Sequence, residues 1–522
     1  MARHTWLALL IWIATHPNAI AAEPLSATAT IDGRRDGGLI DRHIYGHFAE
    51  HLGRCIYDGL WVGPGSPIPN VDGVRTDAIE ALRRIRIPNL RWPGGCFADD
   101  YHWRDGIGPP ADRPQTVNIH WGAVVDTNVF GTHEFLNLCE LLDCEPYVAG
   151  NVGSGSPEEL RDWIEYMTFD GDSELANLRR RNGRDKPWSV PFVGVGNENW
   201  GCGGDMRPQH YADVYRRFAT YCRDFGDNRL TRVASGPSGF DPQSTRVMMQ
   251  RAARYMQAYS IHFYTHVDHN WPQSGGGKVR ATGFGENDWF AVLSECAKMD
   301  RLIVETEQIM DEYDPQRKVD LFVDEWGAWY QTDEGHPGSD LYQQNSLRDA
   351  LLTAITLHIF HEHCDRVRMA NIAQLVNVLQ SLLLTKDELL ILTPTYHVFE
   401  MYKVHQNATR LPVEIHAPGY SYGGRTIPAV SVSASRDQES VVHVSITNAQ
   451  PREAVELEIE LQGIDATHSS GRILTGDTLD AHNSAATPQR VQPTTFDDAR
   501  IVDHRLLATI PAKSVVMVTL KP

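Results

Sequence analysis

The sequence has little cysteine and a deficit of positive charge. Eight cysteines in 522 residues are too few for a fold held together by disulfides. Lys and Arg number 48 against 67 Asp and Glu, which gives a net charge of −19. Proteins that bind nucleic acids need clustered basic side chains to neutralise phosphates, and the sequence has no such clusters. We therefore expect a large globular protein with a neutral partner and no nucleic-acid ligand.

Long apolar segments are also scarce. No stretch beyond the N-terminus is long enough to span a bilayer, so no membrane partner is predicted. Residues 1–22 have the pattern of a signal peptide, because Trp6–Ala14 is apolar and small residues precede Glu23. We expect cleavage after Ala21 or Ala22 and export to the periplasm or the extracellular space. A buried N-terminal helix or a membrane anchor is the alternative.

Residues 43–402 alternate between short apolar runs and helical patterns, which is typical of repeated βα units. An open doubly wound sheet would show a similar alternation, but Gly194–Gly196 lacks the third glycine of the phosphate loop of such a sheet. We therefore predict an α/β fold, a (β/α)₈ TIM barrel. Its predicted strands are Ile44–Phe48, Asn89–Trp92, Glu145–Ala149, Phe192–Val195, Thr231–Ala234, Ala258–Phe263, Leu321–Val323 and Ala373–Leu379.

Residues 403–522 have a different pattern, in which apolar and polar residues alternate without helical periodicity. This pattern predicts a C-terminal antiparallel β-sandwich of the jelly-roll type. Its clearest strands are Ala429–Ser433, Val441–Ile446, Val455–Leu461 and Ser514–Leu520. Residues 23–42 contain one more strand pattern, which we expect to join this sandwich.

Two of the predicted barrel strands end at a glutamate beside amide or aromatic residues. Asn197 and Trp200 flank Glu198, and Trp326 follows Glu325. The C-terminal ends of the strands surround the active site in a (β/α)₈ barrel. The two glutamates are 127 positions apart, or three βα units of about 42 residues, which places them on strands four and seven. We therefore expect both side chains to face one cleft.

Two carboxyl groups about 5–5.5 Å apart perform glycosidic cleavage with retention of configuration, when one is protonated and the other ionised. The alternative for a single isolated glutamate is a capping or ion-paired acid. Glu198 and Glu325 lie at matching strand ends, and this match favours a catalytic pair.

Six further blocks of sequence are specific when they are taken together, whereas an Asn-Glu pair alone marks only a clan of glycosidases. They are Tyr45–Tyr57, Arg91–Gly95, Tyr101–Gly108, Gly196–Asn199, Ser260–Tyr264 and Met369–Gln374. With these blocks the chain resembles glycoside hydrolase family 51, the α-L-arabinofuranosidases of clan A, over essentially its whole length after residue 22.

The resemblance implies a retaining, exo-acting α-L-arabinofuranosidase without a cofactor. Such an enzyme would release terminal arabinofuranose from arabinan, arabinoxylan or derived oligosaccharides by double displacement. Glu198 is implied as the acid/base, Glu325 as the nucleophile and Asn197 as the hydrogen-bond partner of the sugar 2-hydroxyl. The implied partner is an arabinofuranosyl-containing oligo- or polysaccharide. Similar proteins also imply a homo-oligomer, a trimer or a hexamer.

Further substrate-binding residues follow from the resemblance. Glu50 is implied to bind furanose hydroxyls, His262 and Tyr264 to orient the nucleophile, and Trp329 and Gln374 to line the subsite. The structural alternatives are a capping glutamate, aromatic rings of the core, and a buried glutamine paired with the backbone.

Cys96 departs from the family pattern, because many members carry an asparagine there that contacts the sugar. We keep it as a candidate substrate-binding position with three roles open. The thiol can bond weakly to the sugar, pack against its neighbours, or pair with Cys55.

Four residues close together in one helical pattern raise the possibility of a metal site: His358, His361, His363 and Cys364. They lack the i, i+4 pair on one face that zinc peptidases use. We therefore predict no metal, and expect these histidines to interact with carbonyls or solvent at a helix end.

Two other functions remain open at the level of sequence. Another clan A glycosidase, such as an endo-β-glucanase or a β-xylosidase, would use the same two carboxylates, and only the signature blocks favour arabinofuranose. A non-catalytic carbohydrate-binding protein would need the aromatic side chains but neither acid.

Overall fold

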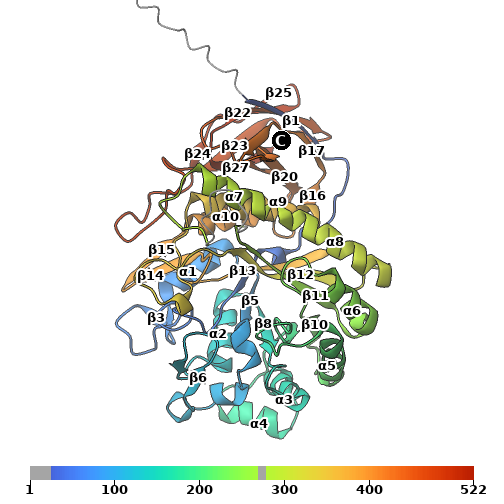
Figure 1. The fold of residues 1–522 in the computed structure, drawn as a ribbon, viewed down its shortest axis with the longest axis vertical. Coiled ribbons are helices and arrows are strands. Elements are labelled where there is room, and N and C mark those ends of the chain that lie inside the picture. Colours follow the sequence, from blue (N-terminus) through green and yellow to red (C-terminus); the bar gives the residue numbers. More distant parts are fainter. Residues whose placement is uncertain (1–24, 268–277) are drawn as a thin grey trace, which may run out of the picture.

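Eight parallel strands close a barrel, as predicted, in a computed structural model that describes residues 25–267 and 278–522 (Figure 1). The strands follow one another round the ring in chain order. They are β2 (Gly46–Phe48), β5 (Asn89–Trp92), β8 (Glu145–Gly150), β9 (Phe192–Val195), β10 (Thr231–Ala234), β11 (Ala258–Thr265), β12 (Asp320–Ala328) and β13 (Val367–Ala373).

Helices connect the barrel strands, or follow the last of them in the case of α10, and cover their outer side (Figure 1). They are α1 (Thr76–Ile85), α2 (Thr132–Leu142), α3 (Pro157–Thr168), α4 (Glu174–Arg181), α5 (Pro208–Tyr221), α6 (Pro242–Ala252), α7 (Glu286–Cys296), α8 (Lys298–Tyr313), α9 (Leu347–Glu362) and α10 (Pro394–Tyr402). In the described part of the chain, no helix is both long and apolar enough to cross a membrane.

Helix α2 shows how local sequence fixes such an element. It occupies the range where apolar residues recur with helical spacing, and Phe135 and Leu142 on that face are buried. Glu134 accepts a hydrogen bond at 2.9 Å from the backbone N–H of Gly131, which would otherwise have no partner at the helix start. The helix ends at Asp143, whose φ of 55° breaks the α-helical geometry.

The eighth strand differs from its prediction, because β13 spans Val367–Ala373 and the predicted Ala373–Leu379 forms the turn after it. The prediction followed the apolar run and missed a polar side chain inside the barrel. Asn371 accepts a hydrogen bond from Asn89 Nδ2 at 2.7 Å there. A shorter strand also starts the barrel, since Arg42–Tyr45 is a 3-10 helix and only Gly46–Phe48 is extended.

Strand β12 has an irregularity that places two neighbouring acids on one side. Ile261 of β11 pairs with Val323, but the next residue, His262, pairs with Glu325. Asp324 is therefore the extra residue of a β-bulge. In a regular strand Asp324 and Glu325 would point to opposite faces. With the bulge, both carboxylates face the barrel interior, where both contact Arg91.

A second domain of strands lies above the barrel and contains the C-terminus (Figure 1). Its six-stranded sheet has the order β16-β20-β21-β27-β23-β24, and its five-stranded sheet has the order β17-β1-β22-β26-β25. The strands are β16 (Thr409–Leu411), β17 (Val413–His416), β20 (Val430–Arg436), β21 (Val442–Asn448), β22 (Val455–Gln462), β23 (His468–Leu474), β24 (Thr494–Phe496), β25 (Arg500–Val502), β26 (Arg505–Ile510) and β27 (Ser514–Lys521).

Strand β1 (Leu25–Asp32) belongs to this second domain although it precedes the barrel in the chain. It pairs in parallel with β22 and antiparallel with β17, so the five-stranded sheet is mixed. In Figure 1 it is the dark blue strand among the red strands at the top.

The described residues also form four two-stranded hairpins: β3 (Asn70–Val71) with β4 (Val74–Arg75), β6 (Thr116–Asn118) with β7 (Val124–Asp126), β14 (Leu383–Lys386) with β15 (Leu389–Leu392), and β18 (Gly419–Tyr422) with β19 (Arg425–Pro428).

Buried histidines join the barrel helices to strand β20. Two lie on α9 and one at the end of the short 3-10 helix Lys403–His405. Each Nδ1 atom is hydrogen-bonded to a serine hydroxyl of β20, and the three serines alternate along the strand so that they share one face. The pairs are His358–Ser431 at 2.9 Å, His361–Ser433 at 2.8 Å and His405–Ser435 at 2.7 Å. The α9 histidines therefore contact hydroxyls rather than the carbonyls or solvent that we expected.

Burial favours the neutral form of these imidazoles. It lowers the pKa of His358 to about 3 and the pKa of His361 and His405 well below the ordinary value. The unfolded chain binds protons on these groups below about pH 6.5, whereas the folded chain does not. Their stabilising contribution is therefore complete above pH 6.5 and is lost as the pH falls.

We expect His358→Gln to make the protein less sensitive to acid. Glutamine can still bond to Ser431 and to the Tyr402 hydroxyl, which lies 3.1 Å from His358 Nε2, but it does not titrate. As the pH falls from 6 to 4, the free energy of unfolding should decrease in both proteins, but the decrease should be smaller in the variant by about 1.4 kcal/mol per pH unit. Urea titration at several pH values measures the two slopes.

His363→Gln is the matched control at the end of the same helix. Burial disfavours the charge of His363, but Asp300 and Glu307 raise its pKa above the ordinary value. Its contribution is present below pH 6.5 and lost only at higher pH, so this variant should keep the wild-type slope between pH 6 and pH 4. An unchanged slope for His358→Gln would contradict the prediction.

Candidate active site

The candidate active site is a pocket of about 250 Å³ at the C-terminal ends of the barrel strands. Both predicted catalytic glutamates line it, together with five other predicted site residues. These five are Glu50, Cys96, Tyr264, Trp329 and Gln374. The other two, Asn197 and His262, are buried and bond to groups of the site.

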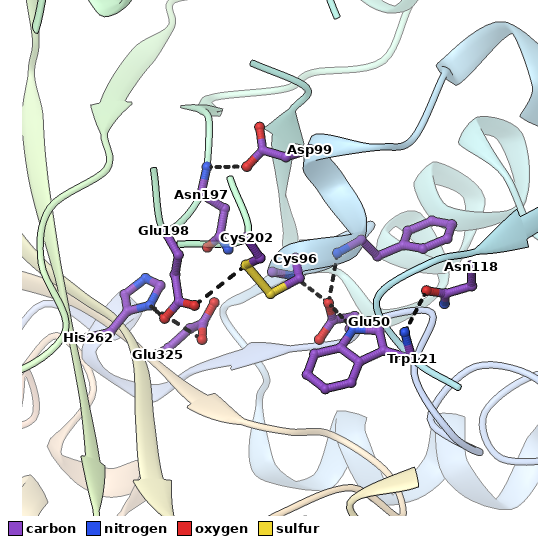
Figure 2. Close-up of a disulfide and its surroundings, with 12 residues drawn as sticks. Glu50, Cys96, Asp99, Asn118, Trp121, Asn197, Glu198, Cys202, His262 and Glu325 are labelled. Carbon is purple, nitrogen blue, oxygen red and sulfur yellow. Dashed lines mark hydrogen bonds and ion pairs between the residues drawn. A yellow bond between two sulfur atoms is a disulfide. The ribbon is translucent and has the colours of Figure 1, made fainter. Parts of the chain in front are cut away.

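The two glutamates lie next to each other, with His262 beside them (Figure 2). Glu325 belongs to β12, and Glu198 lies three residues after the end of β9. A carboxyl oxygen of Glu198, a carboxyl oxygen of Glu325 and an imidazole nitrogen of His262 all lie within 4.8 Å of one another. The closeness of the two carboxyl groups matches the short separation of retaining glycosidases.

Two donors hold the Glu325 carboxylate. Arg91 Nη1 donates to Oε1 at 2.7 Å, and the Tyr264 hydroxyl donates to Oε2 at 2.8 Å. Glu325 is buried, and its pairing with a guanidinium compensates for the lost hydration of the charge. One oxygen of a carboxylate held in this way can act on a bound ligand without moving.

His262 lies between the acids, because it shares the inward face of β11 with Tyr264 two residues later. Its Nδ1 atom is 2.9 Å from Glu198 Oε1 and 3.4 Å from Glu325 Oε2. Its Nε2 atom is 3.1 Å from Asp324 Oδ1. Burial alone would lower the pKa of His262, but the three carboxylates raise it to about 10. The imidazolium therefore supplies positive charge between the two glutamates at neutral pH.

The positive charge of His262 also affects whether the site can bind a metal ion. Glu198, His262 and Glu325 are close enough to share an ion. However, metal ligation requires a neutral imidazole, and a pKa of about 10 keeps both ring nitrogens of His262 protonated at neutral pH. The donor set is therefore better suited to holding protons and sugar hydroxyls.

Asn197 presents a donor to the site. Its Oδ1 atom accepts a hydrogen bond of 2.6 Å from Arg91 Nη2, which fixes the orientation of the amide. Its buried Nδ2 atom has no partner among the described residues and lies close to Glu325, since both approach the position of a Cβ at Gly95. A ligand hydroxyl beside Glu325 would satisfy this donor.

Glu50 is surrounded by hydrogen-bond donors. Its Oε1 atom accepts from the backbone N–H groups of Gly95 and Phe97 and from Trp121 Nε1, at 3.0–3.1 Å (Figure 2). Its Oε2 atom accepts from Gln374 Nε2 at 3.0 Å. Burial and the charge of Glu325 nevertheless raise the pKa of Glu50 to about 7, so a ligand that donates a hydroxyl would stabilise its ionised form.

Gln374 and Trp329 also line the pocket. Gln374 Oε1 and Trp329 Nε1 are buried and have no hydrogen-bond partner in the described part of the chain. The Trp329 ring packs edge-to-face with Tyr264, with ring centroids 5.1 Å apart. A ligand bound here would thus meet one aromatic face and several unpaired polar atoms, as a sugar requires.

The cysteine prediction needs correction. Cys96 forms a disulfide with Cys202, with a Cα–Cα distance of 5.4 Å, whereas Cys55 is a buried free thiol (Figure 2). Of the three roles left open for Cys96, pairing applies, but with a different partner. The partner was hidden because 106 residues separate the two cysteines, and only the closure of the barrel brings their loops together.

Other residues of the site were missed by the sequence analysis. Arg91 lay inside a signature block, and Asp324 precedes a predicted nucleophile, but neither received a role. Burial opposes the ionisation of Asp324, yet Arg91 and His262 hold its pKa below the ordinary value, so it is a further buried charge. Trp121 also gave no signal, because it reaches Glu50 from the turn of the β6–β7 hairpin.

The barrel and its site define a class of enzyme. Two close carboxylates, an imidazolium between them and unpaired polar atoms in a sugar-sized pocket are the features of a retaining glycoside hydrolase. A simple binding protein would have no need to bury this many charges around one point.

Comparisons with known proteins identify the family. Residues 81–274 match the family described as the alpha-L-arabinofuranosidase 1 domain, and residues 324–514 match the alpha-L-arabinofuranosidase C-terminal domain. An enzyme of Bacteroides ovatus named intracellular exo-alpha-L-arabinofuranosidase is 50% identical over 497 residues, which are 95% of this chain and 96% of the relative. The chain belongs to glycoside hydrolase family 51, and this confirms the resemblance seen in its sequence.

Solved structures agree with this assignment. The crystal structure of the GH51 arabinofuranosidase from Xanthomonas axonopodis pv. citri is similar with a TM-score of 0.93 and 46% identity, and covers 95% of this chain and 100% of that one. The arabinose complex of the α-L-arabinofuranosidase from Thermotoga maritima has a TM-score of 0.84 and 30% identity, and covers 95% and 99% of the two chains.

The prediction of export is wrong. It rested on residues 1–22, which lie outside the described residues, and the Bacteroides ovatus relative is named an intracellular enzyme. An apolar run as short as Trp6–Ala14 does not specify export by its hydrophobicity alone, because segments of this length also occur in the cores of globular proteins. The periplasmic or extracellular location is therefore not retained.

We expect Tyr264→Phe to slow catalysis without unfolding the protein. The variant keeps the ring but removes the hydroxyl that donates to Glu325 Oε2. A hydrogen bond to a charged group contributes about 1.5–3 kcal/mol, so kcat/KM for an aryl α-L-arabinofuranoside should fall about 10- to 100-fold. Tyr221→Phe, at an exposed tyrosine of α5, is the control and should match the wild type. Wild-type kinetics in Tyr264→Phe would show that the hydroxyl does not support the nucleophile.

Proposed function

We propose that the chain is a retaining, exo-acting α-L-arabinofuranosidase in which Glu198 is the acid/base and Glu325 the nucleophile. The observation that carries the proposal is the meeting of these two carboxyl groups, within 4.8 Å, in the pocket of a family 51 barrel. A pocket of about 250 Å³ suits a single terminal sugar better than the interior of a polysaccharide, which supports exo action.

In the first step, a carboxylate oxygen of Glu325 attacks the anomeric carbon of the terminal arabinofuranose. The bond between that carbon and the glycosidic oxygen breaks, and the proton of Glu198 moves to this oxygen. Arg91 and Tyr264 hold Glu325 in place and leave its other lone pairs free to react. The product alcohol leaves, and the sugar remains as an ester of Glu325.

In the second step, water attacks the anomeric carbon from the side that the leaving group vacated. Glu198 accepts the proton of the water, and the bond between the sugar and Glu325 breaks. Two inversions give net retention of configuration. The His262 imidazolium lies 2.9 Å from Glu198 and 3.4 Å from Glu325, and its charge stabilises whichever glutamate is ionised at each step.

Sugar recognition depends on unpaired atoms. We assign Asn197 Nδ2 to the 2-hydroxyl, and Glu50 and Gln374 to other ring hydroxyls. The support is that Asn197 Nδ2 and Gln374 Oε1 are buried without partners among the described residues. Trp329 packs against the apolar face of the sugar in this arrangement. Cys96, now in a disulfide, offers only its backbone and an apolar sulfur surface.

We expect replacement of the two acids to separate their roles. Glu325→Ala should lower kcat/KM more than about 10⁴-fold for every substrate, because no bond to the sugar can form. Glu198→Ala should lower kcat/KM about 10²- to 10⁴-fold for substrates with poor leaving groups and far less for aryl glycosides, which need no protonation.

Glu158→Ala is the control for these variants. Its side chain is 76% exposed on α3, and an exposed pair with Arg161 contributes little. Unchanged hydrolysis in either Glu325→Ala or Glu198→Ala would remove the assignment of that residue. Product analysis by NMR tests the mechanism separately, because an inverted first product would exclude double displacement.

The substrate can be tested directly against the rival functions. An aryl α-L-arabinofuranoside should be hydrolysed, whereas an aryl β-xyloside and carboxymethylcellulose should not. The family match and the named relatives favour this outcome over an endo-β-glucanase, a β-xylosidase or a binding protein. Faster hydrolysis of the xyloside or of carboxymethylcellulose would overturn the proposed substrate.

Assembly into a homo-oligomer, a trimer or a hexamer, remains a prediction from the resemblance to the family. Light scattering during gel filtration would measure it, and the mass of a single chain would contradict it.

A further inference from the structure

The loop that carries Glu198 has an unfavourable backbone conformation. Glu198 has a φ of 36°, in the left-handed region that residues other than glycine seldom adopt. The backbone N–H groups of Gly201 and Gly203 both donate to the Glu198 carbonyl, at 2.8 and 3.1 Å, so the chain turns back on itself. Such a conformation persists only when the surroundings hold it.

Asp99 contacts this loop from a neighbouring element. It is the last residue of the 3-10 helix η2 (Cys96–Asp99) and is 3% exposed. Its Oδ2 atom accepts a hydrogen bond from the backbone N–H of Asn197 at 2.8 Å (Figure 2). Its Oδ1 atom accepts from the N–H groups of Val152 and Gly153, at 2.7 and 2.9 Å. One carboxylate therefore joins the loops that follow β8 and β9.

Both loops are shaped to fit Asp99. A Cβ atom at Gly203 would lie 1.7 Å from the Asn197 carbonyl oxygen and 2.8 Å from Asp99 Oδ2. One at Gly153 would lie 2.7 Å from the Asp99 carbonyl oxygen and 2.9 Å from Asp99 Cβ. These distances leave no room for a side chain, so the two glycines allow the loops to pack closely against Asp99 and against the Asn197 backbone.

The other end of η2 is also joined to the Glu198 loop. Cys96 forms the disulfide with Cys202, whose sulfur lies 3.7 Å from Glu198 Oε2 (Figure 2). Asp99 binds the loop one residue before Glu198, and the disulfide binds it four residues after. The segment between the two attachments contains the strained residue.

We propose that Asp99 is a positioning residue that acts through the Asn197 N–H to hold Glu198 at the glycosidic oxygen, with the Cys96–Cys202 disulfide as a second attachment of the same loop. The inference rests on the proposed function, because it assumes that Glu198 is the acid/base.

The effect should be specific to Glu198. Glu325 lies on β12 and is held by Arg91 of β5 and Tyr264 of β11, neither of which belongs to the loop, although Arg91 also donates to the Asn197 side chain. Loss of the Asp99 carboxylate should therefore weaken proton transfer to the leaving group and leave nucleophilic attack almost unchanged. A purely structural role would weaken both.

The charge of Asp99 gives a second test. Burial raises its pKa to about 7, although three backbone N–H groups and the nearby Arg91 favour the ionised form. Tyr211 of α5 is a further titratable group that interacts with the Asp99 carboxylate. Three backbone N–H groups already donate to the two carboxylate oxygens of Asp99. A proton bound to either oxygen would therefore face an N–H donor and weaken that hydrogen bond. Asp99→Asn places an amide in the same space and resembles the protonated state at every pH.

The experiment compares Asp99→Asn with the wild type on 4-nitrophenyl and methyl α-L-arabinofuranoside. The methyl glycoside needs its leaving group protonated, whereas the nitrophenyl glycoside does not. We expect kcat/KM above pH 7 to fall about 10- to 100-fold for the methyl glycoside and less than about 3-fold for the nitrophenyl glycoside. The deficit with the methyl glycoside should shrink as the pH falls below 7, because the wild type then becomes protonated.

Asp100→Asn is the matched control, since Asp100 neighbours Asp99, but within residues 25–267 and 278–522 its carboxylate makes no hydrogen bond to the Glu198 loop. It should behave as the wild type on both glycosides. Equal losses on the two glycosides in Asp99→Asn, or no loss on either, would overturn the proposal.

A second variant keeps the test decisive if Asp99→Asn does not fold. The double variant Cys96→Ser, Cys202→Ser releases the other attachment and should show the same selective loss, whereas equal or absent losses would overturn the proposal. Glu198→Ala, measured in parallel, separates this inference from the proposed function. If it lacks the leaving-group dependence, the acid/base assignment fails. If it alone shows the dependence, only the role of Asp99 fails.

Discussion

The active site depends on holding several carboxylates together where water is scarce. Glu325 and Asp324 are adjacent and buried, and the β-bulge turns both toward the barrel interior. Their repulsion and lost hydration would destabilise the fold without compensation. Arg91 and the His262 imidazolium supply that compensation, and each contacts both acids. Strands β5, β11 and β12 must therefore keep fixed positions relative to one another in the barrel for the charges to balance.

This balance also prepares the site for its chemistry. The guanidinium that pairs with Glu325 also orients Asn197, and the carboxylate of Glu50 orients Gln374. Each polar side chain is thus fixed by a neighbour before any sugar binds, while Asn197 Nδ2 and Gln374 Oε1 remain unpaired. Preorganised dipoles of this kind stabilise developing charge without the cost of reorientation.

The second domain supports the barrel rather than the chemistry. One continuous hydrophobic core runs through both domains, and Trp289 of α7 donates a hydrogen bond to the Ala449 carbonyl beyond β21. Strand β1 enters the five-stranded sheet before the chain begins the barrel, so the two domains are joined at both ends of the barrel sequence. The neutral histidines of α9 add hydrogen bonds that depend on pH at the same interface.

The sequence by itself determined the alternation of strands and helices, the change to period-two strands after residue 402, and the assignment of Glu198 and Glu325 to the fourth and seventh barrel strands, although Glu325 lies inside β12 rather than at its end. The spacing of residues that are close together in the chain predicts each of these features. The tertiary structure alone decided the end of the eighth strand, where Asn371 pairs inside the barrel, the disulfide partner of Cys96, and the contact of Asp99 with the Glu198 loop. These features are contacts between residues that are far apart in the chain. Such residues meet only when the ring of strands closes, and the local periodicity of the sequence does not predict how it closes.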